Sequence, residues 1–254
     1  MPGYQNYEPA FIDPVMEKCF FTLSLQQGSI TTCMTLGILE HKGLAELGTD
    51  CLSVDEQQLY TNFKADRRRS EFLGGRYIAK ESVRHENPDI PPQLINIVHG
   101  VWGFPLIHTR SLHKATISIG HTDRCAAAIF SSSNTIPVGI DIEEIKQENL
   151  RAFTSFITKS EQELIRSGQL PYREAMHLIW SSKEAAGKAL RVGFTIPENL
   201  YAISSIKQTD GLYHVSFEKL GMLQVIGWVY GDFSICIAFP SVWNLGKIKR
   251  RTTE

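Results

Sequence analysis

The sequence contains no apolar run near the roughly 20 residues that a membrane-spanning helix needs, so we expect no membrane insertion. Its first residues have neither a basic stretch nor an apolar core, and we therefore expect no signal peptide. The five cysteines are scattered and form no CxxC pair, which gives no sign of a zinc site. Reduced, mostly buried thiols in the cytoplasm fit this pattern.

Strong charge is also absent, because the formal net charge is −1. No overall field therefore draws the protein to nucleic acid or to a membrane. Nothing in the sequence resembles a Walker A loop, a dinucleotide fingerprint or a GxSxG nucleophile elbow. What remains is an ordinary globular composition of 254 residues, 43% hydrophobic and 21% charged, large enough for one or two domains.

Apolar periodicity predicts an α+β or layered α/β fold, with a helix packed on each antiparallel sheet. The two halves, roughly 1–136 and 137–254, are expected to be similar in plan, although no sequence repeat proves it. We expect strands over 18–25, 115–119, 124–130 and 135–142, with three or four more over 200–240, and helices over 54–65, 68–85, 149–167 and 172–191. Residues 1–17 are expected to be irregular, residues 87–114 rich in loops, and the basic tail over 247–251 disordered.

Two details refine these expectations. Residues 115–142 are expected to form a hairpin-like set of three strands around the connector Ser-Ser-Ser-Asn. Ser160 followed by Glu163 has the spacing of a capping box, which predicts that a new helix begins there.

Asp141 and Glu143 lie two positions apart in the extended segment VGIDIEE, so both carboxylates point to one face of a strand. Ile140 and Ile142 point to the other face, toward the core. A solvated strand face is the more common meaning of such a pair. Carboxylates on one face also suit Mg²⁺, which prefers oxygen ligands and often keeps some of its waters.

The segment WSSKEAAGK forms a helical stripe in which Trp180, Glu184 and Lys188 share a face. A surface salt bridge is the usual meaning of Glu and Lys four residues apart. Gly187 in mid-helix and the large Trp180 indicate instead that the stripe is partly covered. Lys183 adds a second positive charge beside Glu184, so that three carboxylates and two lysines could serve a Mg²⁺-dependent reaction on a diphosphate ester.

Two further sets of candidate phosphate-binding residues also have ordinary structural explanations. His121 follows a predicted strand in the segment SIGH, where a structural histidine is more common than a phosphate-binding one. Arg68 and Arg76 lie about two turns apart on a basic helix, so they could form either a phosphate-binding face or a solvated one.

Taken together, VGIDIE at 138–143 and WSSKEAAGK at 180–188 resemble the paired motifs of the 4′-phosphopantetheinyl transferases of the Sfp type, especially the enterobactin-synthetase branch. RRSEFLGGR at 68–76 and SIGH at 118–121 are similar to two weaker motifs of that family. The resemblance covers roughly residues 55–200.

The resemblance implies a pseudo-dimer of two subdomains with CoA and Mg²⁺ between them. Its first subdomain would take the adenine and 3′-phosphate end of CoA, and its second would hold the metal and the catalytic motifs. Asp141, Glu143 and Glu184 would hold Mg²⁺. The diphosphate would meet His121, Lys183 and Lys188, and the 3′-phosphate or adenine end would meet Arg68 and Arg76. Glu184 would accept a proton, and Lys188 would donate one.

The implied activity transfers the phosphopantetheine arm of CoA to a serine of an acyl or peptidyl carrier protein and releases 3′,5′-ADP. Other readings of the same residues are a Mg²⁺-dependent hydrolase of CoA-like diphosphates and an inactive CoA-binding or carrier-binding homologue. We expect a monomer, and an acidic carrier docking near 149–157. The motifs do not choose between carriers of fatty acid, polyketide, peptide or siderophore synthesis.

The chain departs from the family's pattern at three positions. Gly120 stands in place of the usual Ser before His121, and Phe104 stands where a small or charged residue is common. Trp102 lies before Gly103, where related enzymes can carry a phosphate-binding Lys. These departures concern contacts to CoA and leave the acidic motifs intact.

Overall fold

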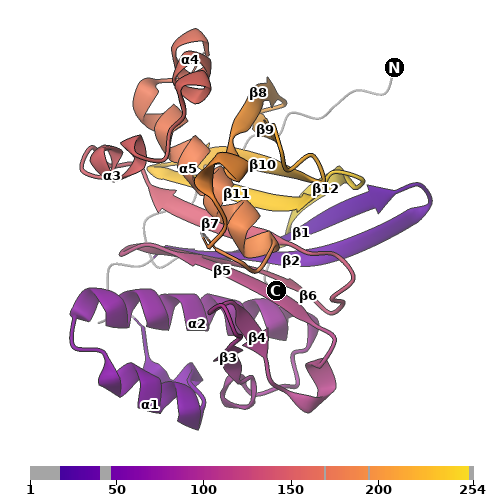
Figure 1. Ribbon diagram of the computed structural model, residues 1–254. Coiled ribbons are helices and arrows are strands. Elements are labelled where there is room, and N and C mark those ends of the chain that lie inside the picture. The colour runs from indigo at the N-terminus through magenta and orange to yellow at the C-terminus, as the bar shows by residue number, and fades with distance from the viewer. Residues whose placement is uncertain (1–17, 41–46, 169, 194, 252–254) are drawn as a thin grey trace.

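A computed structural model describes residues 18–40, 47–168, 170–193 and 195–251, so the expectation for residues 1–17 lies outside it. Within these ranges, two five-stranded sheets and a two-stranded ribbon of β3 and β4 are formed (Figure 1). The strand orders are β12-β1-β2-β6-β5 and β7-β11-β10-β9-β8, and the neighbouring strands are antiparallel. The predicted α+β class is confirmed.

The strands are β1 (Lys18–Gln27), β2 (Ile30–Glu40), β3 (Ile97–His99), β4 (Pro105–Ile107), β5 (Thr116–His121), β6 (Cys125–Ser131), β7 (Gly139–Glu144), β8 (Ile203–Thr209), β9 (Leu212–Phe217), β10 (Leu223–Tyr230), β11 (Phe233–Pro240) and β12 (Asn244–Arg251). The helices are α1 (Val54–Asn62), α2 (Asp66–Glu86), α3 (Leu150–Thr154), α4 (Lys159–Ser167) and α5 (Tyr172–Ala189). No helix among these is both long enough and apolar enough to cross a membrane.

The molecule is built in four layers (Figure 1). Helices α1 and α2 lie on one side of the first sheet, and α5 crosses the outer face of the second sheet. Aliphatic side chains of both sheets meet in a shared middle core, with Leu36 and Ile129 from one sheet and Ile140 and Ile235 from the other. Burial of this shared apolar surface is the main force that holds the two halves together.

The two halves follow the same plan. In the first half, β2 is followed along the chain by α1 and α2, and in its sheet it lies beside the hairpin β5–β6. In the second half, β7 is followed by α4 and α5, and it lies beside the hairpin β10–β11. The division of the chain into 1–136 and 137–254 stays a prediction. Strand β12, at the end of the second half, pairs with β1 in the first sheet.

Four details differ from the sequence expectations. Residues 247–251 belong to β12, because pairing with β1 satisfies their backbone groups. Strand β7 pairs with β11 and leaves the hairpin of β5 and β6. The cap of α4 is Thr158, whose side chain accepts from the backbone N–H of Glu161, two residues before the expected box. Strand β2 was not predicted from the sequence.

Candidate active site

Strand β7 and helix α5 bring the acidic motifs together. Asp141 and Glu143 face α5, whereas Ile140 and Ile142 are buried in the middle core, as the alternation predicts. The strand and the helix run side by side, so residues early in β7 meet residues late in α5. Asp141 is therefore near Lys188, and Glu143 is near Trp180.

Asp141 forms the ion pair at the centre of the site. It is 5% exposed, and Lys188 Nζ donates to its Oδ1 at 2.7 Å. Burial alone would lower the pKa of Lys188, but the charges of Asp141 and Glu184 raise it overall. Oδ2 of Asp141 is buried and has no hydrogen-bond partner among the described residues. One carboxylate oxygen is thus neutralised, and the other is left with unmet acceptor capacity.

Glu143 and Glu184 complete the acidic cluster. Trp180 Nε1 donates to Glu143 Oε1 at 2.9 Å. Burial and the charge of Asp141 raise the pKa of Glu143 to about 8 and that of Glu184 to about 7. Like charges that share a poorly solvated site disfavour ionisation, so the fully ionised cluster would have more negative charge than Lys188 alone offsets.

Strand β5 brings the first half of the chain to this cluster. Ser118 Oγ accepts from the backbone N–H of Ile140 at 3.0 Å. A Cβ at Gly120 would lie 3.0 Å from Ile142 N and 3.1 Å from Asp141 Cα. The departure from Ser to Gly at this position therefore goes with a close approach of β5 to β7.

His121 ends β5 and is exposed. Surrounding protein atoms, and then the charge of Lys188, lower the pKa of its imidazole. The charges of Glu71 and Asp141 oppose this lowering of the pKa, whereas the charge of Arg68 adds to it.

Glu71 on α2 is an acidic residue of this region that the sequence reasoning missed. Arg67 Nε and Arg68 Nη1 donate to its two carboxylate oxygens at 2.9 and 3.1 Å. Burial would raise the pKa of Glu71, but these two guanidinium groups lower it overall. Arg67 also pairs with Asp123 at 2.8 Å. The spacing of Arg67 and Glu71, four residues apart on a helix, was the signal that could have indicated this cluster.

Two residues expected to bind CoA lie outside the cluster. The Arg76 side chain is 7% exposed and pairs with Glu56 at 3.2 Å. The Lys183 side chain is 2% exposed and pairs with Glu161 at 2.8 Å. The motif lysine at 183 and the basic helix end at 76 therefore point into the protein in this structure, and their expected contacts to CoA stay a prediction.

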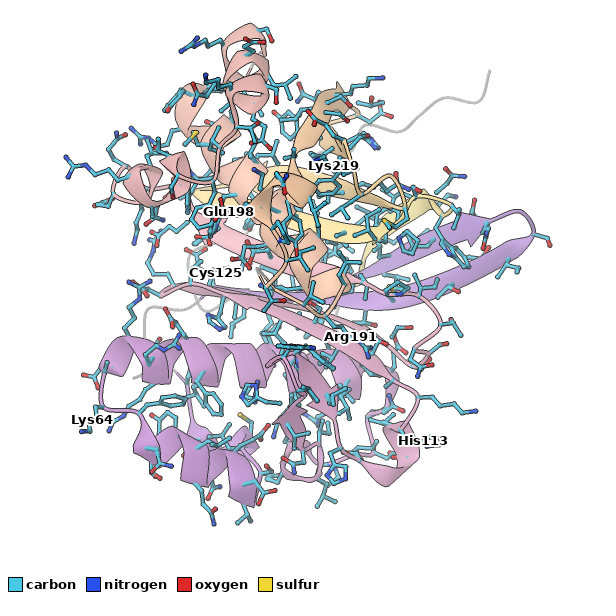
Figure 2. The ribbon with its side chains drawn as sticks, viewed as in Figure 1. Lys64, His113, Cys125, Arg191, Glu198 and Lys219 are labelled. Carbon is cyan, nitrogen blue, oxygen red and sulfur yellow. The ribbon has the colours of Figure 1, made fainter. Side chains whose placement is uncertain are left out.

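The segment around Phe104 connects the first half to the end of α5. The Arg191 guanidinium lies 5.1 Å from the centre of the Phe104 ring. Figure 2 shows Arg191 beyond the end of α5, at the level of the first sheet. Trp102, at the turn between β3 and β4, is 64% exposed.

The segment 149–157, where we expect an acidic carrier to dock, has three of its apolar side chains buried. Leu150, Phe153 and Ile157 are each at most 8% exposed and pack into the core beneath α5. The exposed residues of this segment include Arg151 and Ser155.

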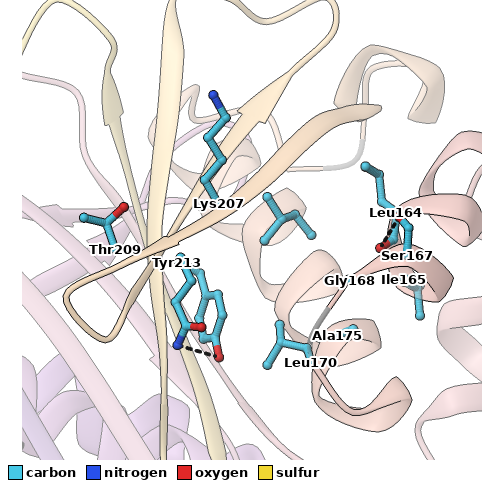
Figure 3. Close-up of a pocket in the computed structure, with 11 residues that line it drawn as sticks. Leu164, Ile165, Ser167, Gly168, Leu170, Ala175, Lys207, Thr209 and Tyr213 are labelled. Atoms are coloured by element: carbon cyan, nitrogen blue, oxygen red, sulfur yellow. Dashed lines mark hydrogen bonds between the residues drawn. The ribbon is translucent and has the colours of Figure 1, made fainter.

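A separate groove with a volume of about 560 Å³ lies between α4, the start of α5 and strands β8 and β9 (Figure 3). Its lining includes Leu164, Leu170, Ile206, Lys207 and Tyr213. It shares no residue with the acidic cluster, and we assign it no role.

The carboxylates of this cluster fit a metal ion only when other ligands join them. Within the described ranges, no group of three or more His, Cys, Asp or Glu side chains is arranged so that it could hold a metal by itself. Mg²⁺, however, is commonly bound by one or two carboxylates together with waters and substrate phosphates. The unpartnered Oδ2 of Asp141, beside two carboxylates of raised pKa, fits a cation that arrives with a phosphate ligand.

Comparison with known proteins agrees with this geometry. Residues 137–238, which carry β7 and α5, match the family model of the 4′-phosphopantetheinyl transferase superfamily. Over this segment, which is less than half of its length, the chain is similar to this superfamily. The family resemblance drawn from VGIDIE and WSSKEAAGK is therefore confirmed.

Curated relatives of the superfamily carry two names. Enterobactin synthase component D of Salmonella typhimurium is 27% identical over 157 residues, which are 61% of this chain and 60% of that protein. The protein of the same name from Escherichia coli K12 is 30% identical over 128 residues, 50% of this chain and 56% of that protein. The 4′-phosphopantetheinyl transferase gsp of Aneurinibacillus migulanus is 28% identical over 209 residues, 80% of this chain and 83% of that protein. The chain thus spans 60% or less of these two component D proteins.

Proposed function

We propose that this protein transfers the 4′-phosphopantetheine arm of CoA to a serine of an acyl or peptidyl carrier protein. One observation carries the proposal: Asp141, Glu143, Glu184 and Lys188 form a single cluster on β7 and α5, inside the segment that matches the superfamily. His121 of the first half faces the same cluster. A charged substrate could therefore contact both halves at once.

Asp141, Glu143 and Glu184 would hold the cofactor, which we propose is Mg²⁺. The excess negative charge and the unpartnered Asp141 Oδ2 support this set. When bound, the ion would neutralise and orient the diphosphate of CoA.

The chain's own residues would then handle protons and phosphate charge. The carrier serine oxygen attacks the β-phosphorus of CoA as its proton passes to Glu184. The bond from this phosphorus to the bridging oxygen breaks, and 3′,5′-ADP leaves. Lys188, held protonated by its carboxylate neighbours, stabilises the charge on that oxygen and donates a proton to it.

Phosphate binding falls to fewer residues than the motifs suggested. His121 would contact the diphosphate, and Arg68, whose side chain is 66% exposed, would reach the 3′-phosphate end. Arg76 and Lys183 are left out of this set, because both are buried in ion pairs.

The test is the intact mass of an apo carrier protein after incubation with this protein, CoA and Mg²⁺, with EDTA as a control. Relatives named enterobactin synthase component D make a siderophore-synthase carrier the first to try. The proposal expects a phosphopantetheine-sized gain that EDTA abolishes. Glu184→Gln and Asp141→Asn should each abolish it, whereas Glu174→Gln, which changes a half-buried glutamate in the first turn of the same helix, should leave it unchanged.

Each other outcome has a definite meaning. Cleavage of CoA without modification of any carrier would favour the hydrolase. No consumption of CoA across several carrier types would favour an inactive binding homologue. Undiminished transfer by Glu184→Gln would contradict the role given to this carboxylate.

A further inference from the structure

We infer that Lys183 is a positioning residue, which fixes Trp180 against Glu143 through the segment that joins α3 to α4. The inference concerns the site of the proposed function and rests on that function for its catalytic meaning. Lys183, the first lysine of the segment WSSKEAAGK, would then have a structural role inside the protein and no contact with the substrate.

Lys183 links helix α5 to helix α4 and to the segment between α3 and α4. Its Nζ donates to Glu161 Oε2 at 2.8 Å and to the Phe156 carbonyl oxygen at 2.5 Å. Glu161 Oε2 also accepts from the backbone N–H of Thr158 at 2.8 Å, and Glu161 Oε1 accepts from that of Ile203 at 2.9 Å. Since Glu161 is 0% exposed, removal of either partner would leave the other charge buried and unpaired, which is strongly destabilising.

Phe156 carries this constraint to Trp180. Its ring meets the Trp180 ring edge-on, with 4.9 Å between centroids. The Phe153 ring stacks on the same indole at 4.8 Å. The indole is thus held between two rings of one short segment, and its Nε1 donates to Glu143 Oε1. Loss of the Lys183 contact to the Phe156 carbonyl would therefore loosen the group that orients Glu143.

The first half of the molecule contains a twin of this arrangement. Lys80 on α2 pairs with Glu56, and its Nζ donates to the carbonyl oxygens of Cys51 and Pro92 at 2.7 and 3.0 Å. Glu56 belongs to the capping box of α1 and accepts from the backbone N–H of Ile97 at 3.2 Å. In both halves, therefore, a buried lysine–glutamate pair joins the two helices to the strand that follows them.

Among the residues that the structure describes, the twin lacks the counterpart of Asp141. Gly37 of β2 meets Ser82 of α2 as Gly139 of β7 meets Ala185 of α5, so the buried Leu39 stands where Asp141 stands in the second half. A buried Lys–Glu pair thus occurs in this fold beside a strand that has a leucine at the position of Asp141. Lys80 consequently provides a matched control for Lys183.

The test uses the whole protein labelled with 5-fluorotryptophan at its four tryptophans, each of which should give its own ¹⁹F resonance. The Trp180 resonance is assigned by its loss in Trp180→Phe. We expect Lys183→Met to shift or broaden this resonance, and Lys80→Met to leave it in place. In the transfer assay, Lys183→Met should lower kcat about tenfold with KM for CoA unchanged, as loss of a supporting contact does, while Lys80→Met should retain kcat.

A raised KM for CoA with an unchanged Trp180 resonance would overturn the inference and return Lys183 to substrate binding. If Lys183→Met does not fold, Phe156→Leu tests the same chain of contacts and leaves the buried ion pair intact. It should move the Trp180 resonance and lower kcat, and an unchanged resonance would overturn the inference. If the unmodified protein transfers nothing, the proposed function fails, but the ¹⁹F measurements still decide the positioning role.

Discussion

Gly139 is the residue that lets strand β7 pack closely against helix α5. A Cβ at this position would collide with the Ala185 carbonyl oxygen and the Ala189 backbone nitrogen. Both obstacles are backbone atoms of α5 and cannot rotate away. The glycine of the segment VGIDIE is therefore required by the close packing that also brings Asp141 to Lys188.

We predict that Gly139→Ala costs on the order of 3 kcal/mol of unfolding free energy, because α5 must move away from β7. Urea denaturation would measure the change. The control is Gly221→Ala, since a Cβ there meets no atom within 4 Å and the backbone is not left-handed. Equal stability of the two variants would contradict the close packing.

The hydrogen bonds of His177 predict that the free energy of unfolding depends on pH. Its Nδ1 donates to the Arg173 carbonyl oxygen at 2.8 Å, and its Nε2 accepts from the backbone N–H of Lys146 at 3.2 Å, which requires the neutral ring. Burial lowers the pKa of His177 below its usual 6.5. Stability from this group is therefore complete above about pH 6.5 and is lost as the pH falls through the lowered pKa.

We expect the unfolding free energy to fall between pH 7.5 and pH 5 by more in the unmodified protein than in His177→Gln. Glutamine can still accept from Lys146 but does not titrate. Parallel pH curves for the two proteins, measured by urea denaturation, would contradict this prediction.

At the scale of elements, the start of α4 shows which of two overlapping capping-box patterns the chain uses. Both Thr158-Lys159-Ser160-Glu161 and Ser160-Glu161-Gln162-Glu163 have the spacing of a capping box. The first is used, because Glu161 also accepts from Ile203 and Lys183. Sequence spacing alone could not decide between them, since these partners come from distant parts of the chain.

We predict that Thr158→Ala lowers the unfolding free energy by about 1 kcal/mol, the usual cost of losing a helix cap. Ser160→Ala should change it by much less, because Ser160 lies inside the first turn of α4. Guanidinium denaturation of both variants would decide, and the reverse order would restore the Ser160 cap.

Strands show most clearly what the sequence could and could not predict. The apolar alternation of 135–142 and 200–240 indicated β7 to β11, but it did not indicate partners, so β7 was grouped with β5 and β6. Strand β12 was missed because its lysines suggested a solvated tail. Lysines are common on edge strands, where they discourage pairing with other molecules. At the site, Asp141, Glu143, Glu184 and Lys188 were found from residue type and spacing, whereas Glu71 and the burial of Lys183 depend on tertiary packing.

At the scale of the whole molecule, the two halves share one core. Ile140 and Ile235 of the second sheet are buried against Leu36 and Ile129 of the first. Neither sheet could therefore lose its structure without exposing the inner face of the other. The site lies where the halves meet, so its geometry depends on the same contact.

We predict a single cooperative thermal transition. Calorimetry should give equal calorimetric and van't Hoff enthalpies, because the shared core couples both halves. Two resolved transitions would contradict this prediction. Sedimentation in the same buffer would test the expectation of a monomer.

The pairing of β1 with β12 has a consequence for rearranging the gene. Phe20 lies opposite Arg251, so the first and last described strands run side by side with residues from the two ends of the fold adjacent. A short linker could join these ends, and new termini could be opened in the segment 132–138 that connects β6 to β7. Such a circular permutant would exchange the order of the two halves along the chain and keep every strand pairing. It would also place the acidic segment at 138–143 close to the new N-terminus, where a synthetic label could be attached beside the site.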